Sequence, residues 1–258
     1  MIDVLAAEWL KLRSVRSTAW TLATAAAFLV LCGFWSWLAA RYWDGLAPER
    51  RATAQAAPAV QPLVLALPIC AAVLGALTFT SEYATGMIRT SLAAVPRRGP
   101  LFAAKAVVVG AVTLVTALVC LAAAVAAGRM IVGDRPIPAF DAEFSQHVPY
   151  VLALGATAMV IALVACGLGA AVRSTAGTIT GVVVLLAVLP PLAALLPSPW
   201  GERIASVLPL SLPDQIAAAP GFSGDPGVLS RPWAVVLLAA YTLIALGAGA
   251  FSFARRDS

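Results

Sequence analysis

The chain has 258 residues, of which 61% are hydrophobic and only 11% are charged. Soluble globular domains carry about 25% charged residues, so this sequence has less than half of the charge that a water-exposed surface needs. The composition excludes a soluble enzyme, and its hydrophobicity excludes a disordered chain. A mean hydropathy of +0.93 indicates an integral membrane protein.

The first 16 residues predict a short helix that lies in the inner headgroup layer. The apolar residues share one helical stripe and the charged residues lie mostly away from it: Ile2, Leu5, Trp9 and Leu12 against Glu8, Lys11 and Arg13. A tryptophan on one face and cations on the other are typical of an interfacial helix. The alternative is a positively charged lead-in to the first span, and either reading makes this segment an anchor.

Six apolar segments are long enough to cross a bilayer, whose hydrocarbon core of about 30 Å needs roughly 20 helical residues. They are continuous rather than alternating, which favours helices over the strands of a barrel. The segments are Thr18–Ala40, Pro62–Thr80, Leu101–Ala127, Val148–Val172, Ala176–Leu196 and Trp233–Phe253. The sequence therefore predicts an all-α fold with six transmembrane helices, in a single domain over residues 1–258.

The basic residues predict the orientation of these spans, because cytoplasmic segments carry an excess of Lys and Arg. With the N-terminus inside, ten of the 17 basic residues fall in inner segments. Both termini are then expected in the cytoplasm, in a multi-pass protein of the cell (plasma) membrane. The net charge of +5 follows from this topology and does not indicate a nucleic-acid partner.

The outer connection at 197–232 is long and moderately apolar, and loops of that length without structure are uncommon. We predict short re-entrant helices there, before the last span. Pro190 and Pro191 precede this connection and remove two backbone donors, so they kink the fifth span or end it. A kink would form an outer gate together with the 197–232 segment, whereas simple termination of the span is the alternative.

Several kinds of chemistry have no residues to support them in this sequence. No predicted span carries a centrally placed ionisable residue, which argues against proton-coupled transport. The four cysteines fall within spans without metal-binding spacing, so we expect them to act as packing residues: Cys32, Cys70, Cys120 and Cys166. No Walker loop is present, so any ATP must bind to another polypeptide. An intramembrane enzyme would have to rely on Ser223 or on His147, the one histidine.

The inner connection at 82–100 carries the most specific pattern. Gly86 lets the chain leave the second span, residues 87–95 can form a short helix, and Pro96 stops it. The expected apolar stripe of this helix is Met87, Ile88, Leu92 and Val95, and its charged residue is Arg89. A short helix with an apolar stripe is suited to insertion into a groove on a partner. Arg97, Arg98 and Lys105 are expected at the membrane surface.

Two stretches of the sequence resemble type 2 ATP-binding cassette (ABC) exporter permeases. The pattern Glu82-Tyr83-x-x-Gly86-x-Ile88-Arg89-x-Ser91-Leu92, followed by Pro96-Arg97-Arg98 and Lys105, is similar to the first cytoplasmic loop of that family. The opening Glu8-Trp9-x-Lys11-Leu12-Arg13-Ser14 is similar to the start of its members. Six spans and a long outer loop before the last one agree with the resemblance.

The resemblance implies a permease subunit that exports a substrate and is driven by a separate cytoplasmic ABC ATPase. The ATPase would bind ATP and Mg²⁺, and this chain would have no catalytic residue and no cofactor of its own. Residues 1–16 would be the elbow helix and residues 86–96 the coupling helix, in a complex with a second permease (the same or a different chain) and with membrane lipid. The implied ATPase-coupling residues are Glu82, Gly86, Met87, Ile88, Arg89, Leu92, Pro96 and Arg97.

Some alternatives remain open at this stage. Glu82 and Arg89 are expected to contact the ATPase, but Glu82 is equally able to pair with Arg173 or Arg89 and so hold the helix ends. The nearly uncharged spans favour a hydrophobic or amphipathic cargo such as a lipid, drug or peptide. A second functional hypothesis is a non-transporting membrane subunit that anchors or assembles a partner protein at residues 82–105.

Overall fold

The computed structural model describes residues 2–51, 56–95, 97–137, 140, 144–217 and 229–255, and in these ranges it contains helices and no strand. Six helical segments are long and apolar enough to cross a membrane, which confirms the predicted all-α, six-span architecture. The spans are α2 (Arg16–Gly45), α4 (Gln61–Thr85), α6 (Arg98–Val132), α7 (Phe144–Val172), α12 (Arg231–Arg255) and a composite fifth span. The fifth span joins α8 (Thr175–Val183), the π-helix η1 (Val184–Val188) and α9 (Leu189–Ala194).

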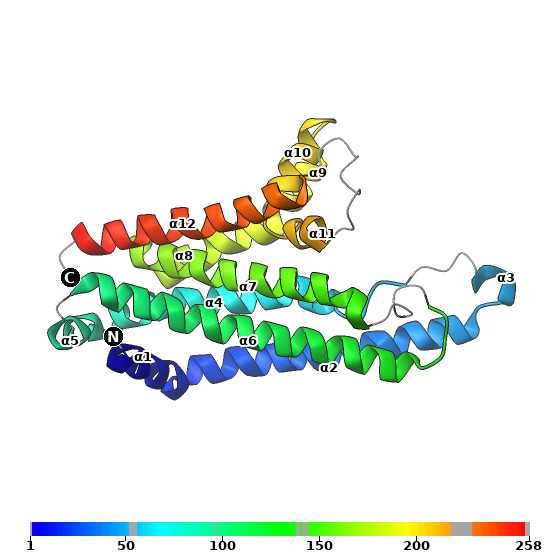
Figure 1. Cartoon of the computed structure of the whole chain (residues 1–258), viewed down its shortest axis with the longest axis horizontal. Helices are drawn as coiled ribbons and strands as arrows, with labels where there is room; N and C mark the ends of the chain where they lie inside the picture. The colour runs from blue at the N-terminus through cyan, green and yellow to red at the C-terminus, as the bar shows by residue number, and fades with distance from the viewer. Residues whose placement is uncertain are drawn as a thin grey trace.

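In the part of the chain that the structure describes, five short helices lie at the two ends of the bundle: α1 (Ile2–Ser14), α3 (Pro48–Arg51), α5 (Met87–Ala94), α10 (Trp200–Val207) and α11 (Leu212–Ala217). Figure 1 shows α1, α5 and the last turn of α12 at one end, which we name the terminal end. The helices α3, α10 and α11 lie toward the opposite, distal end. The predicted short helices within 197–232 are therefore present, whereas residues 218–228, with Ser223, lie outside the described ranges.

The first and third spans are longer than the sequence pattern predicts. Helix α2 has 30 residues and α6 has 35, which at 1.5 Å per residue gives roughly 45 and 52 Å. Both exceed a hydrocarbon core of about 30 Å. At their distal ends, the carboxylate of Asp44 forms a bidentate pair with the guanidinium of Arg135 at 2.8 and 2.9 Å. This pair fastens the end of α2 to the segment that follows α6.

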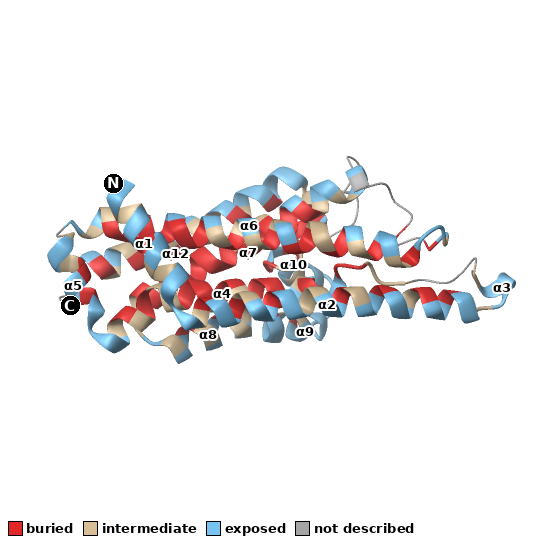
Figure 2. Cartoon of the chain, turned by 90° about the horizontal axis from the view of Figure 1, so that it is seen from below, coloured by how far each residue is buried: buried red, intermediate tan, exposed pale blue. Residues whose placement is uncertain are grey.

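Helix α7 is the central helix of the bundle, because it packs against α4, α6, α8, α11 and α12. Most of its residues are buried, as Figure 2 shows. Glycines make these contacts close: a Cβ on Gly75 of α4 would clash with the Ala162 carbonyl of α7, and one on Gly167 of α7 would clash with the Ala245 carbonyl of α12. Small residues at helix contacts are how membrane helices gain van der Waals packing.

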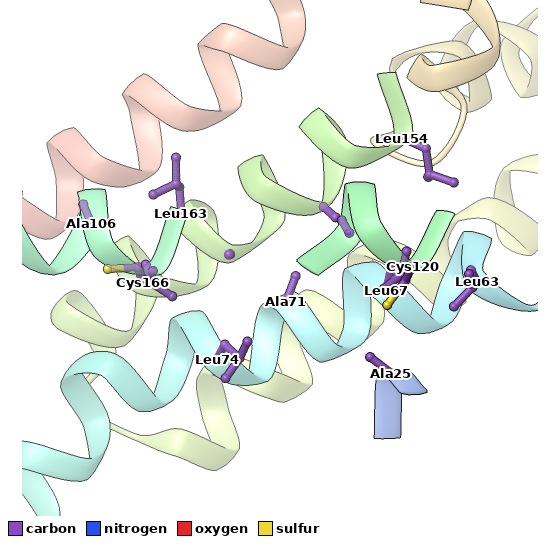
Figure 3. Packing of buried hydrophobic residues seen from close by; sticks show 14 of the residues in the cluster. Ala25, Leu63, Leu67, Ala71, Leu74, Ala106, Cys120, Leu154, Leu163 and Cys166 are labelled. Carbon is purple, nitrogen blue, oxygen red and sulfur yellow. The ribbon is translucent and has the colours of Figure 1, made fainter. Parts of the chain in front are cut away.

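The hydrophobic core runs between α4, α6 and α7, with α2 along one side. Figure 3 shows Leu67, Ala71 and Leu74 of α4 in this cluster together with residues of the neighbouring helices. All four cysteines are free thiols, and Cys32, Cys120 and Cys166 are buried while Cys70 is half-buried. They fill space between helices, as expected for small, polarisable side chains.

The fourth and fifth spans form the tight hairpin that the sequence predicts. Arg173 adopts a left-handed φ of 59° directly after α7. Ser174 then caps α8, since its hydroxyl accepts a hydrogen bond from the Gly177 N–H at 3.2 Å. The Thr175 hydroxyl donates to that of Thr80 at 2.8 Å, which ties the hairpin to α4.

The fifth span does not end at its two prolines. The chain forms the π-helix η1 just before them, with the Leu189 N–H donating to the Val184 carbonyl, and continues as α9 to Ala194. Proline has no N–H and its ring displaces the preceding turn, so a local change from α to π geometry lets the helix proceed. The expectation that Pro190 and Pro191 terminate the span is therefore wrong.

The close contact between α7 and α12 predicts a specific packing defect. Gly167→Ala places a methyl group against the Ala245 carbonyl, and overpacking of this kind costs about 1–3 kcal/mol. We expect a lower midpoint of thermal unfolding for the purified variant in detergent. Gly247→Ala is the matched control, because a Cβ there has nothing within 4 Å. Equal unfolding temperatures for the two variants would contradict the assigned helix contact.

Candidate functional site

Two glutamates and two lysines meet at the terminal end of the bundle. The ammonium of Lys105 donates to Glu8 Oε2 at 2.8 Å and to Glu82 Oε1 at 2.7 Å. The ammonium of Lys11 donates to Glu8 Oε1 at 2.8 Å and to Glu82 Oε1 at 3.1 Å. We name these four side chains the ion-pair network. They come from α1, α4 and α6, so a single set of contacts joins three helices.

Burial makes this network costly to disrupt. Glu8, Glu82 and Lys105 are 6%, 3% and 2% exposed. A charge in such surroundings needs both a counter-charge and hydrogen bonds, because its desolvation penalty amounts to several kcal/mol. The two positive and two negative charges balance, and the Lys105 ammonium also lies 5.5 Å from the centre of the Phe79 ring. The network is therefore neutral as a whole.

Lys11 is the most accessible member of the network. Burial opposes its charge, but hydrogen bonds to Glu8 and Glu82 and their negative charges outweigh that effect and raise the pKa of Lys11 above its ordinary value. A lysine with a raised pKa stays protonated at neutral pH. Lys11 therefore remains charged at neutral pH and donates to both glutamates.

Helix α1 presents Glu8 toward the bundle. Val4 and Leu12 pack against the main core, and Glu8 lies between them on the same face at helical spacing. The side chains of Ile2 and Trp9 are exposed on the surface of the bundle. The sequence places both on the stripe that is predicted to face the membrane. Glu8 and Lys11 turn toward the bundle because Lys105 and Glu82 offer them partners there, whereas Arg13 is exposed.

The short helix α5 is attached to the network through Ser91. The Lys11 ammonium donates to the Ser91 hydroxyl at 3.0 Å, and that hydroxyl donates to Glu82 Oε2 at 3.4 Å. Gly86 makes the attachment geometrically possible: its left-handed φ of 72° ends α4 and turns the chain directly into α5. The break at Gly86 that the sequence predicts is confirmed.

The apolar stripe of α5 packs against its own chain. Ile88 is 4% exposed and belongs to the main core, and Leu92 and Val95 pack against the same core. The expectation that Ile88 and Leu92 insert into a partner's groove is therefore corrected. The outward surface of the segment, which we name the α5 outer face, consists of Met87, Arg89, Thr90, Ala93 and Arg97. Pro96 lies outside the described residues.

The structure also shows where Glu82, Arg173 and Lys105 lie relative to the positions that the sequence predicts. Glu82 faces the lysines, whereas the Arg173 guanidinium lies over the Tyr83 ring, 4.8 Å from its centre. Lys105, expected at the membrane surface, is buried seven residues after the start of α6. The buried Glu82 carboxylate is paired with Lys11 and Lys105 within this chain, which agrees with the alternative in which it holds the helix ends.

The terminal end also fixes the last span. The Arg98 guanidinium donates to the carbonyls of Phe253 and Ala254 at 3.0 and 3.2 Å, which caps the end of α12. Beneath it, the rings of Phe79, Phe102 and Phe253 pack together with centre-to-centre distances of 5.3 to 6.2 Å. The chain just after α5 is thus connected to α12 as well as to α4.

Comparison with known families gives one match. A family model described as ABC-2 family transporter protein matches residues 4–190, which is more than half of the chain. The chain belongs to the ABC-2 transporter family. It is therefore a multi-pass membrane protein and a permease of an ABC transporter. The matched region contains the whole ion-pair network and α5 and ends at Pro190, and no curated protein matches the chain.

Because the charges of the network balance, we expect the effects of substitutions in it on the free energy of unfolding to be strongly non-additive. Lys105→Met or Glu82→Gln alone leaves an uncompensated buried charge, so each lowers the free energy of unfolding by about 3–5 kcal/mol. The double variant is neutral again, and we expect it to lose clearly less than the sum of the two. Chemical denaturation of the purified protein measures this cycle.

The exposed pair at the distal end provides a control for the cycle. Asp44→Asn breaks the bidentate contact with Arg135, but both side chains are well exposed. Exposed pairs contribute little to stability, so this variant should unfold like the wild type. Additive effects of the two buried substitutions would contradict the assignment of a coupled network.

Proposed function

We propose that this permease works with a separate cytoplasmic ABC ATPase and that the α5 outer face is the surface that docks on it. The observation that carries the proposal is the ion-pair network, which attaches a short, exposed helix to three other helices through buried charges. A loop that only connects two spans needs no such support. Lys11 and Glu82 hold Ser91 of α5, so the network is suited to transmit force from a bound partner.

The chemistry of the α5 outer face supports a protein partner. Met87 is 42% exposed, and exposed methionine adapts to irregular surfaces. Arg89 and Arg97 are exposed and place two cations beside it, and arginine is enriched at protein interfaces. Ile88 and Leu92 support this surface from behind, Glu82 holds its position, and Gly86 sets its angle.

The remaining functional assignments follow from the same arrangement. We propose that the terminal end faces the cytoplasm, because the excess of basic residues lies on that side, and that the protein resides in the plasma membrane. Two permease subunits and two ATPases form the working complex in this proposal. The substrate class that the apolar spans favour is hydrophobic or amphipathic, and export is the direction that the family resemblance implies.

Charge reversal on the α5 outer face tests the proposal. We expect Arg89→Glu combined with Arg97→Glu to reduce co-purification with the ATPase at least about tenfold, because two favourable contacts become repulsive. The protein should remain folded and inserted, since both side chains are exposed. Arg231→Glu, at the exposed start of α12, is the matched control and should leave co-purification unchanged.

Two results would overturn this proposal. Undiminished recovery of the ATPase with the double variant would show that α5 is not the docking surface. ATPase binding without any stimulation of ATP hydrolysis by the wild-type permease in vesicles would favour a non-transporting subunit that only anchors its partner.

We also propose an outer gate at Pro190 and Pro191, supported by the π-helix that precedes them. The prolines leave carbonyls of the preceding turn without their usual donors, and π segments in helices are frequent at functional sites. Replacing both prolines by alanine restores two N–H groups. We expect slower hydrogen exchange over residues 184–196 in the variant, measured by mass spectrometry. Unchanged exchange there would show that the prolines do not loosen this segment.

A further inference from the structure

A crevice opens beside the ion-pair network, between α1, the start of α2, α4 and α6. It has a volume of about 70 Å³, which is room for several water molecules. Glu8, Glu82 and Lys105 line its buried side, and Val15 and Met87, both exposed at 42%, stand at its mouth. The crevice is therefore reached from the surface near the joint between α1 and α2.

The lining changes from charged to apolar along the direction of the spans. On α4, the lining begins with Leu74 and Leu77, continues with Ser81 and ends at Glu82. Leu74 and Glu82 are eight residues apart, about 12 Å along the helix. On α6, Val108 lies one turn farther into the bundle than Lys105. The charged end thus lies toward the terminal end and the apolar end toward the middle of the membrane.

The donors and acceptors that the network already uses determine which chemical group of a ligand can bind at the charged end of the crevice. An ammonium has three donors and no acceptor. Lys105 uses all three on Glu8, Glu82 and the Thr78 carbonyl, the last at 3.4 Å. Lys11 uses its three on Glu8, Glu82 and Ser91.

The carboxylates, in contrast, keep acceptor capacity. Each oxygen of Glu8 accepts one of these lysine bonds, although a carboxylate oxygen has two lone pairs. A ligand at this end therefore has to bring N–H or O–H donors. An additional acceptor, such as a phosphate oxygen, would find no free lysine donor in the network.

We propose that this crevice binds the headgroup of an ethanolamine phospholipid from the adjoining leaflet, with its ammonium on Glu8 and Glu82. The ammonium supplies three donors to the open acceptor positions, and the acyl chains stay in the surrounding bilayer, outside the crevice. Arg13 and Arg16 flank Val15 in the chain and are exposed, so cations lie near the mouth for the lipid phosphate. The polarity of the crevice matches the orientation of a lipid in that leaflet.

Lipid retention measured by native mass spectrometry tests the proposal without the ATPase. The full chain is purified from nanodiscs that contain equal amounts of phosphatidylethanolamine, phosphatidylcholine and phosphatidylglycerol with identical acyl chains. We expect about tenfold more retained phosphatidylethanolamine than phosphatidylcholine, because the trimethylammonium of choline has no N–H to donate. Phosphatidylglycerol brings hydroxyl donors but no ammonium for the two carboxylates, and should be retained less.

Two tryptophan variants locate the site. Val15→Trp fills the mouth without removing a charge and should abolish the preference for phosphatidylethanolamine. Val30→Trp on α2, a position that is 74% exposed, is the matched control and should keep it. Equal retention of ethanolamine and choline lipids by the wild type overturns the proposal, as does preferential retention of phosphatidylglycerol or a preference that survives in Val15→Trp. The wild-type comparison decides the matter even if Val15→Trp fails to fold.

Discussion

A neutral set of two glutamates and two lysines, buried at one end of a helical bundle, is the interaction on which the organisation of this permease depends. Each of these charges would be strongly destabilising without its partners. Glu8 therefore cannot be buried unless α1 lies against α6, and Lys105 cannot be buried unless α1 and α4 both reach it. The electrostatic requirement specifies one relative position for these helices, which hydrophobic packing alone would leave less defined.

The consequence is a continuous mechanical connection at the terminal end. Ser91 joins α5 to the network, and Arg98, just beyond α5, caps the end of α12. From there, the close contact of α12 with Gly167 continues the connection to the central helix α7. A load applied to the α5 outer face is thus passed to at least five helices through buried or close contacts. In our proposal this is how ATP hydrolysis in a partner reaches the membrane-spanning part of the permease.

The architecture was accessible from the sequence because long apolar runs have only one stable form in a bilayer. Six spans, the break at Gly86 and the hairpin after Val172 all depend on local patterns, and all were predicted. Helix lengths were underestimated, since α2 and α6 continue beyond the apolar run. The π-helix before Pro190 was missed, because a span can accommodate prolines by a local change of geometry rather than by ending.

The candidate site was predicted only in part, for a physical reason. The local sequence motif was enough to identify residues 82–100. Glu8 and Lys105, however, are 97 positions apart, and their pairing depends on a tertiary contact. Treating Lys105 as a surface residue was the decisive error. The available signal was its position: a lysine several residues inside an apolar span needs a buried acid. The acids on the same side were Asp3, Glu8, Glu82 and Asp257. The sequence alone could not show whether the apolar side of α5 faces its own bundle or a partner, because that depends on the tertiary core against which α5 packs.

The central claim is that the ion-pair network makes α1 and α5 move as one unit. Spin labels at exposed positions Arg13 of α1 and Ala94 of α5, with a third at Thr180 of α8 as reference, measure this by pulsed electron spin resonance in the complex with its ATPase. We predict a narrow α1–α5 distance distribution that is the same with and without ATP, while distances to α8 change. In Lys105→Met the α1–α5 distribution should broaden. Separation of α1 from α5 on ATP binding, with the wild-type network in place, would contradict the account.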